Sequence, residues 1–279
     1  MTRVKLPGRI LVALTMLFLY LPILVLVVFS FNSTKSRTIW TGFTLDWYAK
    51  LFNDATILNA LNVTLAVSVL AALIATVFGT FAAIGLFNMR RRVRAPLMAI
   101  NNIPVMNADI ITGVSLSLLF VSAGAIFHFS LGFGTLLIAH ITFNIPYVIL
   151  SVMPKLYQLD KNLFEAAQDL GCTWMQAFVR VIIPEIMPGI INGMIIAFTM
   201  SIDDFVISYF TAGSRGVQTL SMVIYSMTRR RVSPEINAIS TLLFGAVLIL
   251  LIVINVREVR QERLMKKRNA ILSKGETAN

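Results

Sequence analysis

Charged side chains are scarce in this chain of 279 residues. Only 13% of its residues are Asp, Glu, Lys or Arg, whereas 57% are hydrophobic. The mean hydropathy is +0.80. Because soluble globular domains carry about 25% charged residues, this composition excludes an ordinary soluble domain. It predicts a single polytopic membrane domain, which we expect to be all-α.

Residues that carry out chemistry are also scarce. Cys172 is the single cysteine and permits no internal disulfide. His128 and His140 are the only histidines and lack accompanying ligands, so we expect no metal site. No Walker-type glycine loop is present, so we expect no nucleotide binding by this chain through that motif. The adjacent Asp203 and Asp204 are weak candidates for an embedded acid–base pair, and we expect no enzyme activity.

Acidic residues are outnumbered by basic ones, 13 against 24, which gives a net charge of +11. Such an excess can indicate nucleic-acid binding. Here, however, the basic residues gather at the ends of long apolar segments, as the positive-inside rule predicts for a membrane protein. We therefore expect membrane lipid, and not nucleic acid, to be the partner of these charges.

Six apolar segments are long enough to cross a bilayer. They cover about residues 10–31, 58–87, 96–122, 133–153, 188–210 and 237–256. The first segment has no small-residue cleavage pattern after it, so we expect no cleavable signal. The predicted division is an N-terminal segment of residues 1–9, a membrane domain of residues 10–256 and a basic tail of residues 257–279.

The distribution of Lys and Arg orients these spans. With the N-terminus in the cytoplasm, 17 of them fall on the cytoplasmic side and 7 on the outer side. The asymmetry predicts that both termini are cytoplasmic. Arg229, Arg230 and Arg231 fall on the outer side and count against this topology. We interpret them as solvated, with contact to a soluble receptor or to a pathway mouth as the alternative.

The segment between the fourth and fifth spans reads as two short helices with a sharp corner. We call residues 154–187 the corner segment. Asp160 can cap a first helix over about residues 161–170, and Gly171 follows where a left-handed turn costs least. Thr173 and Gln176 have capping-box spacing for a second helix.

Pro184 is expected to end that second helix, because proline lacks the amide hydrogen that a helix interior needs. Each helix has an apolar face. The first face consists of Leu163, Phe164, Ala167 and Leu170, and the second of Trp174, Phe178, Val181 and Ile182.

The corner segment resembles the coupling loop of permease subunits of binding-protein-dependent ABC importers. The family pattern is Glu-Ala-Ala, three residues, Gly, nine residues and Ile-x-Leu-Pro. Glu165, Ala166, Ala167, Gly171 and Pro184 match it, and Val181 and Ile183 are conservative replacements. The resemblance implies a type I ABC importer permease fold, and a loop that inserts into a groove on a cytoplasmic ATPase subunit. The alternative is an amphipathic hairpin on the membrane surface.

Other motifs resemble spermidine/putrescine permease subunits, above all the second of the two. They are Ser30-Phe31-Asn32-Ser33, Trp40-x-Gly42-Phe43-Thr44-x-x-Trp47-Tyr48, Ser201-Ile202-Asp203-Asp204 and Ser233-Pro234-Glu235-Ile236-Asn237-Ala238. The resemblance implies half of a polyamine pathway in a bacterial inner membrane. It also implies three partners: a second homologous permease subunit, a cytoplasmic dimer that binds ATP and an extracytoplasmic polyamine-binding protein.

Three carboxylates fall within or near the apolar segments. A charge at the bilayer centre costs about 2.5–3.5 kcal/mol on insertion scales. Asp109, Asp203 and Asp204 are therefore candidates for acceptors of the protonated amines of a polyamine, with Tyr209 or Phe205 as an aromatic wall. The alternative is that these carboxylates cap broken helices or form bonds across a subunit interface.

No internal repeat is visible in the sequence. Many secondary transporters consist of two matching inverted halves, so this class is the weaker alternative. An ABC importer for another small solute, such as an amino-acid derivative or an inorganic ion, is the alternative within the same class.

Overall fold

The computed structural model describes residues 6–34, 39–160, 162–213, 216–230, 235–249, 252 and 256. Within these ranges the chain is helical apart from connections and an isolated β-bridge between Asn32 and Phe43. The expected all-α fold is therefore confirmed. The predicted tail 257–279 lies outside the described residues, as do residues 1–5 and the positions Lys161, Arg231, Ser233 and Pro234.

The chain divides into two compact units, Met1–Asn53 with Met227–Asn279, and Asp54–Ser226. The first unit contains α1 (Leu6–Phe29), α2 (Asp46–Asn53) and the apolar helix Glu235–Ile249. Its loop before α2 is held by aromatic contacts. The ring of Phe31 stacks on those of Phe43 and Tyr48, at 5.3 and 5.2 Å between centroids. The Trp47 Nε1–H donates to the Asn32 carbonyl at 2.8 Å.

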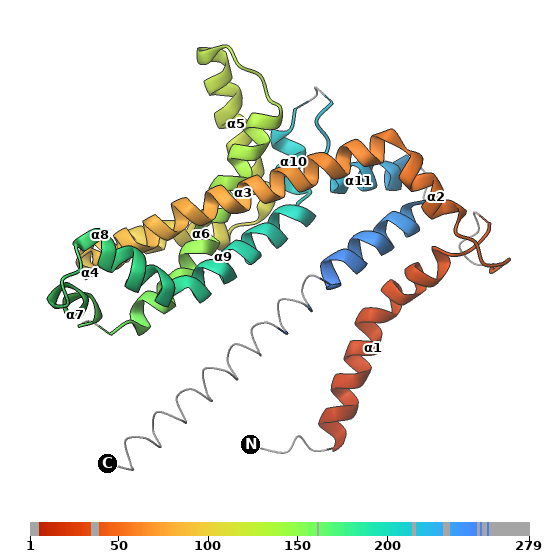
Figure 1. The fold of residues 1–279 in the computed structure, drawn as a ribbon. Helices are drawn as coiled ribbons and strands as arrows, with labels where there is room; N and C mark the ends of the chain where they lie inside the picture. The colour runs from red at the N-terminus through yellow and green to blue at the C-terminus, as the bar shows by residue number, and fades with distance from the viewer. Residues whose placement is uncertain are drawn as a thin grey trace. The chain divides into compact units, whose positions relative to one another are not determined.

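Three long helices form the centre of the second unit (Figure 1). They are α3 (Ala55–Asn88), α6 (Phe133–Gln158) and α9 (Ile183–Asp203), and each packs against the other two. Small residues let their backbones approach closely. A Cβ atom on Gly79 of α3 would lie 2.7 Å from Val148 of α6, and one on Gly193 of α9 would lie 3.2 Å from the Val148 Cα.

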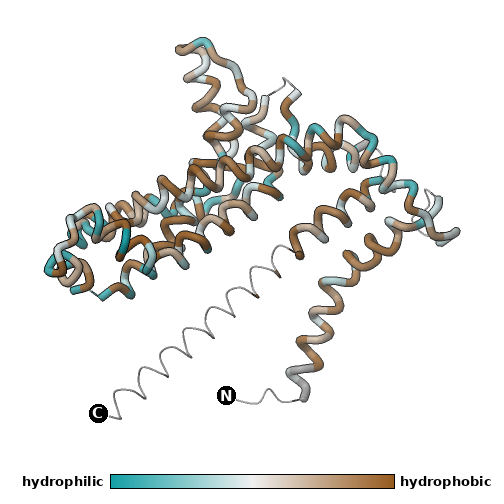
Figure 2. Tube along the Cα trace, viewed as in Figure 1, coloured by the Kyte–Doolittle hydropathy of each residue, from teal (hydrophilic) through white to brown (hydrophobic). Residues whose placement is uncertain are grey.

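Five described helices are long and apolar enough to cross a membrane, and Glu235–Ile249 is a shorter apolar helix. Together, these five helices and the shorter one correspond in number to the six predicted spans. The five are Ile10–Phe29, Ala55–Asn88, Asp109–Phe127, Phe133–Gln158 and Trp174–Asp203. Figure 2 shows hydrophobic residues along most of the length of α1 and α3, and hydrophilic residues gathered around α7.

The third predicted span, residues 96–122, is wrong as a single helix. The structure has α4 (Arg91–Met106) and α5 (Asp109–Phe127), separated by Asn107 and Ala108 in extended conformation. Pro104, where the sequence favours a kink because proline removes a backbone donor, lies inside α4 and not at the break. Asp109 falls in the first turn of α5, where a carboxylate interacts favourably with the helix dipole.

The fifth predicted span, residues 188–210, differs at both ends. A continuous helix runs from Trp174 to Asp203, made of α8 (Trp174–Ala177), the π-helical turn η1 (Phe178–Ile182) and α9. After Asp204 and Phe205 a short helix α10 (Val206–Thr211) follows, and later α11 (Leu220–Arg230). The expectation that Pro184 ends the second helix of the corner segment is wrong.

The π-turn explains how the helix passes through Pro184. The Ile183 amide bonds to the Phe178 carbonyl, five residues back, where an α-helix would use the carbonyl four residues back. In a regular helix a proline ring collides with the carbonyl four residues before it, which for Pro184 is that of Arg180 within the π-turn. The widened turn just before Pro184 relieves this collision, and π-turns of this kind recur at functional sites.

Candidate functional site

The first half of the corner segment forms the helix α7 (Leu163–Asp169). The Asp160 carboxylate accepts a hydrogen bond from the Asn162 amide at 3.0 Å, so the helix begins slightly later than predicted. Gly171 has a φ of +88°, and a Cβ atom there would meet nothing within 4 Å. Glycine is therefore needed for the left-handed corner itself and not for space, as the sequence predicts.

The second half begins with the predicted capping box. The Gln176 amide donates to the Thr173 hydroxyl at 3.4 Å, and the Thr173 amide donates to the Gln176 Oε1 at 3.0 Å. These reciprocal bonds satisfy two amides that the start of α8 would otherwise leave open. They fix the direction in which the chain leaves the corner.

The two apolar faces of the corner segment meet in one aromatic stack. Phe164 contacts Trp174 edge-on at 6.4 Å, and Trp174 lies parallel to Phe178 at 5.5 Å between centroids. Leu170, predicted to belong to the first face, is instead 87% exposed. It lies in the turn after α7, where no neighbour covers it.

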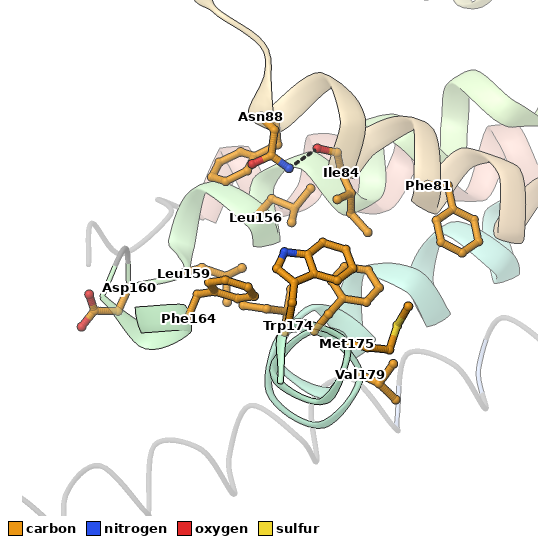
Figure 3. Close-up of a pocket in the computed structure, with 13 residues that line it drawn as sticks. Phe81, Ile84, Asn88, Leu156, Leu159, Asp160, Phe164, Trp174, Met175 and Val179 are labelled. Atoms are coloured by element: carbon orange, nitrogen blue, oxygen red, sulfur yellow. Dashed lines mark hydrogen bonds between the residues drawn. The ribbon is translucent and has the colours of Figure 1, made fainter. Parts of the chain in front are cut away.

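An apolar pocket of about 640 Å³ lies between the corner segment and the ends of α3 and α6. Figure 3 shows the Trp174 ring turned toward Ile84 of α3 and Leu156 of α6, whereas the Asp160 carboxylate points away from the pocket. The corner segment thus rests on the three-helix core through aromatic side chains. The interface is not tightly filled.

The predicted coupling residues lie on different surfaces of this segment. Glu165, Ala166 and Gly171 are exposed, whereas Ala167 is buried. Pro184 is exposed on the first turn of α9, beyond the π-turn. Glu165, Ala166 and Gly171 are thus accessible around the corner, whereas Ala167 is covered.

The opposite end of the same continuous helix carries the acidic pair. Asp204 has extended backbone angles, and its two carboxylate oxygens accept the amides of Ile207 and Ser208 at 3.2 and 2.8 Å. Asp204 therefore caps α10, in agreement with the alternative prediction that these carboxylates cap broken helices. Its side chain is 7% exposed, whereas Asp203 is exposed. The adjacent carboxylates thus point to different surroundings.

Asp204 belongs to a buried polar cluster between α6 and the α9–α10 junction. We call it the polar cluster, and its residues are His140, Asn144, Ser201, Asp204 and Ser208. Nε2 of His140 lies 3.1 Å from the Ser208 hydroxyl and 3.5 Å from Oδ2 of Asp204. One turn along α6, the Asn144 amide donates to the Ser201 hydroxyl at 2.7 Å.

The sequence alone assigns no functional role to His140 or Asn144. The available signal was their spacing of four residues within an apolar span, which places two polar side chains on one helix face. Their partners, Ser208 and Ser201, lie 68 and 57 residues further along the chain. Among the described residues, no group of three His, Cys, Asp or Glu could hold a metal ion.

Tyr209 and Asp109 complete the predicted acidic site. Tyr209 is 55% exposed and lies 5.5 Å from the ring of Phe205, which also contacts Tyr225 of α11 at 4.3 Å. Asp109 is exposed at the start of α5, which packs on α10. The structure therefore brings Asp203, Asp204 and Tyr209 to one junction and places Asp109 on a neighbouring helix.

The corner segment and the acidic pair lie at opposite ends of the α3, α6 and α9 bundle (Figure 1). They are joined by the 30-residue helix Trp174–Asp203. At 1.5 Å per residue this helix is about 45 Å long.

Comparison with known proteins adds three findings about sequence. The model of the family described as "Binding-protein-dependent transport system inner membrane component" matches residues 75–266. The chain is 42% identical over 248 residues to the putrescine transport system permease protein PotI of Escherichia coli K12, covering 88% of each. It is 37% identical over 235 residues to the spermidine/putrescine transport system permease protein PotC of the same strain, covering 84% of the chain and 87% of PotC.

Solved structures share the fold at low sequence identity. A chain of a bacterial ABC transporter that imports the acidic polysaccharide alginate aligns with a TM-score of 0.69 at 16% identity, over 91% of this chain and 99% of that one. A chain of the MetNI methionine ABC transporter aligns with a TM-score of 0.56 at 22% identity, over 71% and 92%. These likenesses concern the fold, and they confirm the type I importer permease fold expected from the sequence.

Proposed function

This chain belongs to the family of binding-protein-dependent transport system inner membrane components, and we propose that it forms half of a polyamine pathway in an ATP-driven importer. As a family member it is a membrane permease subunit of an ABC importer. The polyamine assignment is supported by PotI and PotC, whose names give putrescine and spermidine/putrescine as cargo. The acidic residues at the α9–α10 junction suit a cationic cargo.

The observation on which the coupling proposal depends is the unbroken helix Trp174–Asp203. Its first residue, Trp174, contacts Phe164 of α7 edge-on at 6.4 Å between ring centroids, and its last residue is the exposed Asp203. A push on the exposed edge of α7 moves this helix as one body. The corner segment is therefore proposed to couple the pathway to a separate ATPase, with Glu165, Ala166 and Gly171 at the contact and Ala167 and Pro184 in its support.

In the pathway, we assign the role of ammonium acceptor to Asp203, because its carboxylate is exposed while that of Asp204 is occupied with capping α10. Tyr209 forms an aromatic wall beside it, and cations bind favourably over aromatic faces. Asp109 supplies a second, spaced acceptor on α5. Such spacing suits cargo whose protonated amines are separated by methylene groups.

The proposed topology places the corner segment in the cytoplasm. The basic run Arg90–Arg94 lies at the start of α4, and the Arg94 guanidinium lies over Tyr157 near the end of α6, 5.3 Å from the ring centroid. Basic residues at this end of the core favour the cytoplasmic side. On this proposal both termini are cytoplasmic, with residues 1–9 before and the basic tail 257–279 after the membrane domain 10–256.

The proposed partners follow from the same scheme. A second homologous permease subunit completes the pathway, and a cytoplasmic ATPase dimer binds the ATP. An extracytoplasmic polyamine-binding protein delivers cargo to the outer face of the bacterial inner membrane. The chain itself needs no cofactor in this scheme. Its contribution is the pathway and the helix that links it to the ATPase.

A transport assay with matched variants tests this proposal. The assembled transporter is reconstituted in proteoliposomes, and ATP-dependent uptake of labelled putrescine and spermidine is measured with unlabelled amino acids and inorganic ions as competitors. Glu165→Ala is expected to abolish most uptake while the subunit still inserts into the membrane. Glu185→Ala is the control within the corner segment and is expected to retain uptake, because Glu185 lies beyond the π-turn in the first turn of α9 and not on α7.

Two results would contradict the proposal in separate ways. Full uptake by Glu165→Ala would remove the coupling role of the corner segment. Absence of ATP-dependent polyamine uptake by a complex that does take up another labelled solute would leave the permease function intact but exclude polyamines as cargo.

A further inference from the structure

The polar cluster contains side chains that the proposed pathway does not use. His140 and Asn144 of α6 are both 0% exposed. Burying a polar side chain costs free energy unless hydrogen bonds replace those lost to water. A leucine would fill the space of an imidazole without this cost. The contacts that His140 makes are therefore the place to look for its role.

His140 approaches two groups on the other side of the helix interface with a single nitrogen. Its Nε2 lies 3.1 Å from Oγ of Ser208 and 3.5 Å from Oδ2 of Asp204. The Ser208 amide donates to that same carboxylate oxygen at 2.8 Å. One side chain of α6 thus contacts both the residue that caps α10 and the first turn of the helix that it caps.

The direction in which Asp203 points depends on this arrangement. Asp203 is the last residue of α9 and Asp204 follows in extended conformation. Because the two residues are adjacent, holding the Asp204 carboxylate inward against α6 and α10 leaves the Asp203 carboxylate on the exposed side. Release of Asp204 would free the backbone at the break and would offer cargo a second carboxylate beside the first.

We propose that His140 is a positioning residue of the transport pathway: through Ser208 and Asp204 it fixes the α9–α10 break and thereby presents Asp203 to the cargo ammonium. This inference rests on the proposed function. It concerns a buried residue that does not touch cargo, so its loss should change how efficiently the cycle moves cargo and not how cargo is captured outside the membrane.

Two substitutions of similar size separate positioning from space-filling. His140→Gln keeps a polar nitrogen close to the Nε2 position, whereas His140→Leu fills the space without one. Uptake is measured in proteoliposomes and divided by the amount of assembled complex, and ATP hydrolysed per polyamine transported is measured in parallel. His128→Asn is the histidine control, because His128 is exposed and has a φ of 56°, which asparagine tolerates.

His140→Leu is expected to lower uptake about tenfold per complex, to raise ATP consumed per polyamine and to leave KM unchanged, since loss of a hydrogen bond to a charged group has effects of this size. His140→Gln and His128→Asn are expected to stay within about twofold of the wild type on the same scale. A double-mutant cycle with Asp204→Asn should be non-additive, because both substitutions break one contact.

Equal uptake per complex by the Leu and Gln variants would overturn the proposal, and so would additive effects of His140→Leu and Asp204→Asn. If His140→Leu does not assemble, Ser208→Ala asks the same question by removing one hydroxyl. Lowered uptake at unchanged assembly supports the proposal, and unchanged uptake overturns it. A wild-type complex that moves no polyamine would instead contradict the proposed function, a result that the wild-type sample itself reveals.

Discussion

The two ends of the helix Trp174–Asp203 are held in place by different kinds of contact. At the corner segment the contacts join residues that are close together in the sequence: the Thr173–Gln176 capping box, the turn at Gly171 and the stack of Trp174 on Phe178. At the acidic end the contacts are buried and join residues that are far apart in the sequence, His140 with Ser208 and Asn144 with Ser201.

This difference suits the two tasks that we propose. Local contacts keep the corner segment rigid within itself while its support, an apolar pocket of about 640 Å³, leaves room for displacement. Buried contacts to α6 fix the acidic end relative to the core. Force that the ATPase exerts on the corner segment is therefore expected to move the helix. The position of the Asp203 carboxylate at the acidic end is expected to determine how this movement affects bound cargo.

The largest effect is expected at the acidic end itself. Asp203→Asn removes the exposed negative charge while it keeps the size of the side chain. Because hydrogen bonds to charged groups contribute about 1.5–3 kcal/mol, uptake per assembled complex should fall by about tenfold or more. Asp203→Glu, which keeps the charge, should retain more uptake. Equal uptake by the Asn and Glu variants would remove Asp203 from the pathway.

The core that joins the two ends is tested by adding a side chain to it. Gly79→Leu should destabilise the packing of α3 on α6 by about 1–3 kcal/mol, because a Cβ atom there already lies 2.7 Å from Val148. Gly85→Leu on the same helix is the control, since a Cβ atom there meets nothing within 4 Å. Thermal unfolding in detergent measures both, and a loss of similar size for the two variants would contradict the packing described here.

The corner is tested by the backbone angle of Gly171. Gly171→Val should cost about 1–2 kcal/mol, because a β-branched residue strains a left-handed conformation, and it should lower ATP-dependent uptake several-fold. Gly171→Asn should retain most uptake, since asparagine adopts this conformation more easily. Uptake assays at matched abundance compare the two. If valine and asparagine behave alike, the corner does not depend on its left-handed turn.

The smallest effect is expected at the capping box. Thr173→Ala removes the hydroxyl that accepts the Gln176 amide and should cost about 1 kcal/mol of helix stability. Thr173→Ser keeps the hydroxyl and is the control. Hydrogen exchange of the α8 amides should show faster opening in the alanine variant alone, and equal exchange in both variants would show that the cap contributes nothing to the corner.

The sequence predicts the corner well because its signals are local. The cap spacing of Thr173 and Gln176 and the need for glycine at 171 depend on residues only a few positions apart. Pro184 misled the prediction because the rule against proline assumes a regular α-helix, whereas the chain inserts a π-turn before it. In the third span the sequence favours a kink at Pro104, whereas the first helix ends at Met106 and the next begins at Asp109.

At the acidic end the sequence predicts which residues matter but not how their side chains are arranged. The residue types of Asp203 and Asp204 indicate a functional role for carboxylates in an apolar chain, yet nothing local says which one turns inward. That choice depends on His140, which lies 68 residues from its partner Ser208. Only the packing of α6 against the α9–α10 junction distinguishes the buried cap from the exposed acceptor.

The central claim is that the corner segment contacts an ATPase in the cytoplasm, and cysteine cross-linking tests it most directly. Leu170→Cys is introduced with Cys172→Ser, because Leu170 is 87% exposed at the corner and Cys172 is the only native thiol. Tyr209→Cys in the same background labels the acidic end. We predict a cross-link to the ATPase subunit from position 170 and none from position 209. Labelling of position 170 from outside the cell, without any cross-link to the ATPase, would contradict the account.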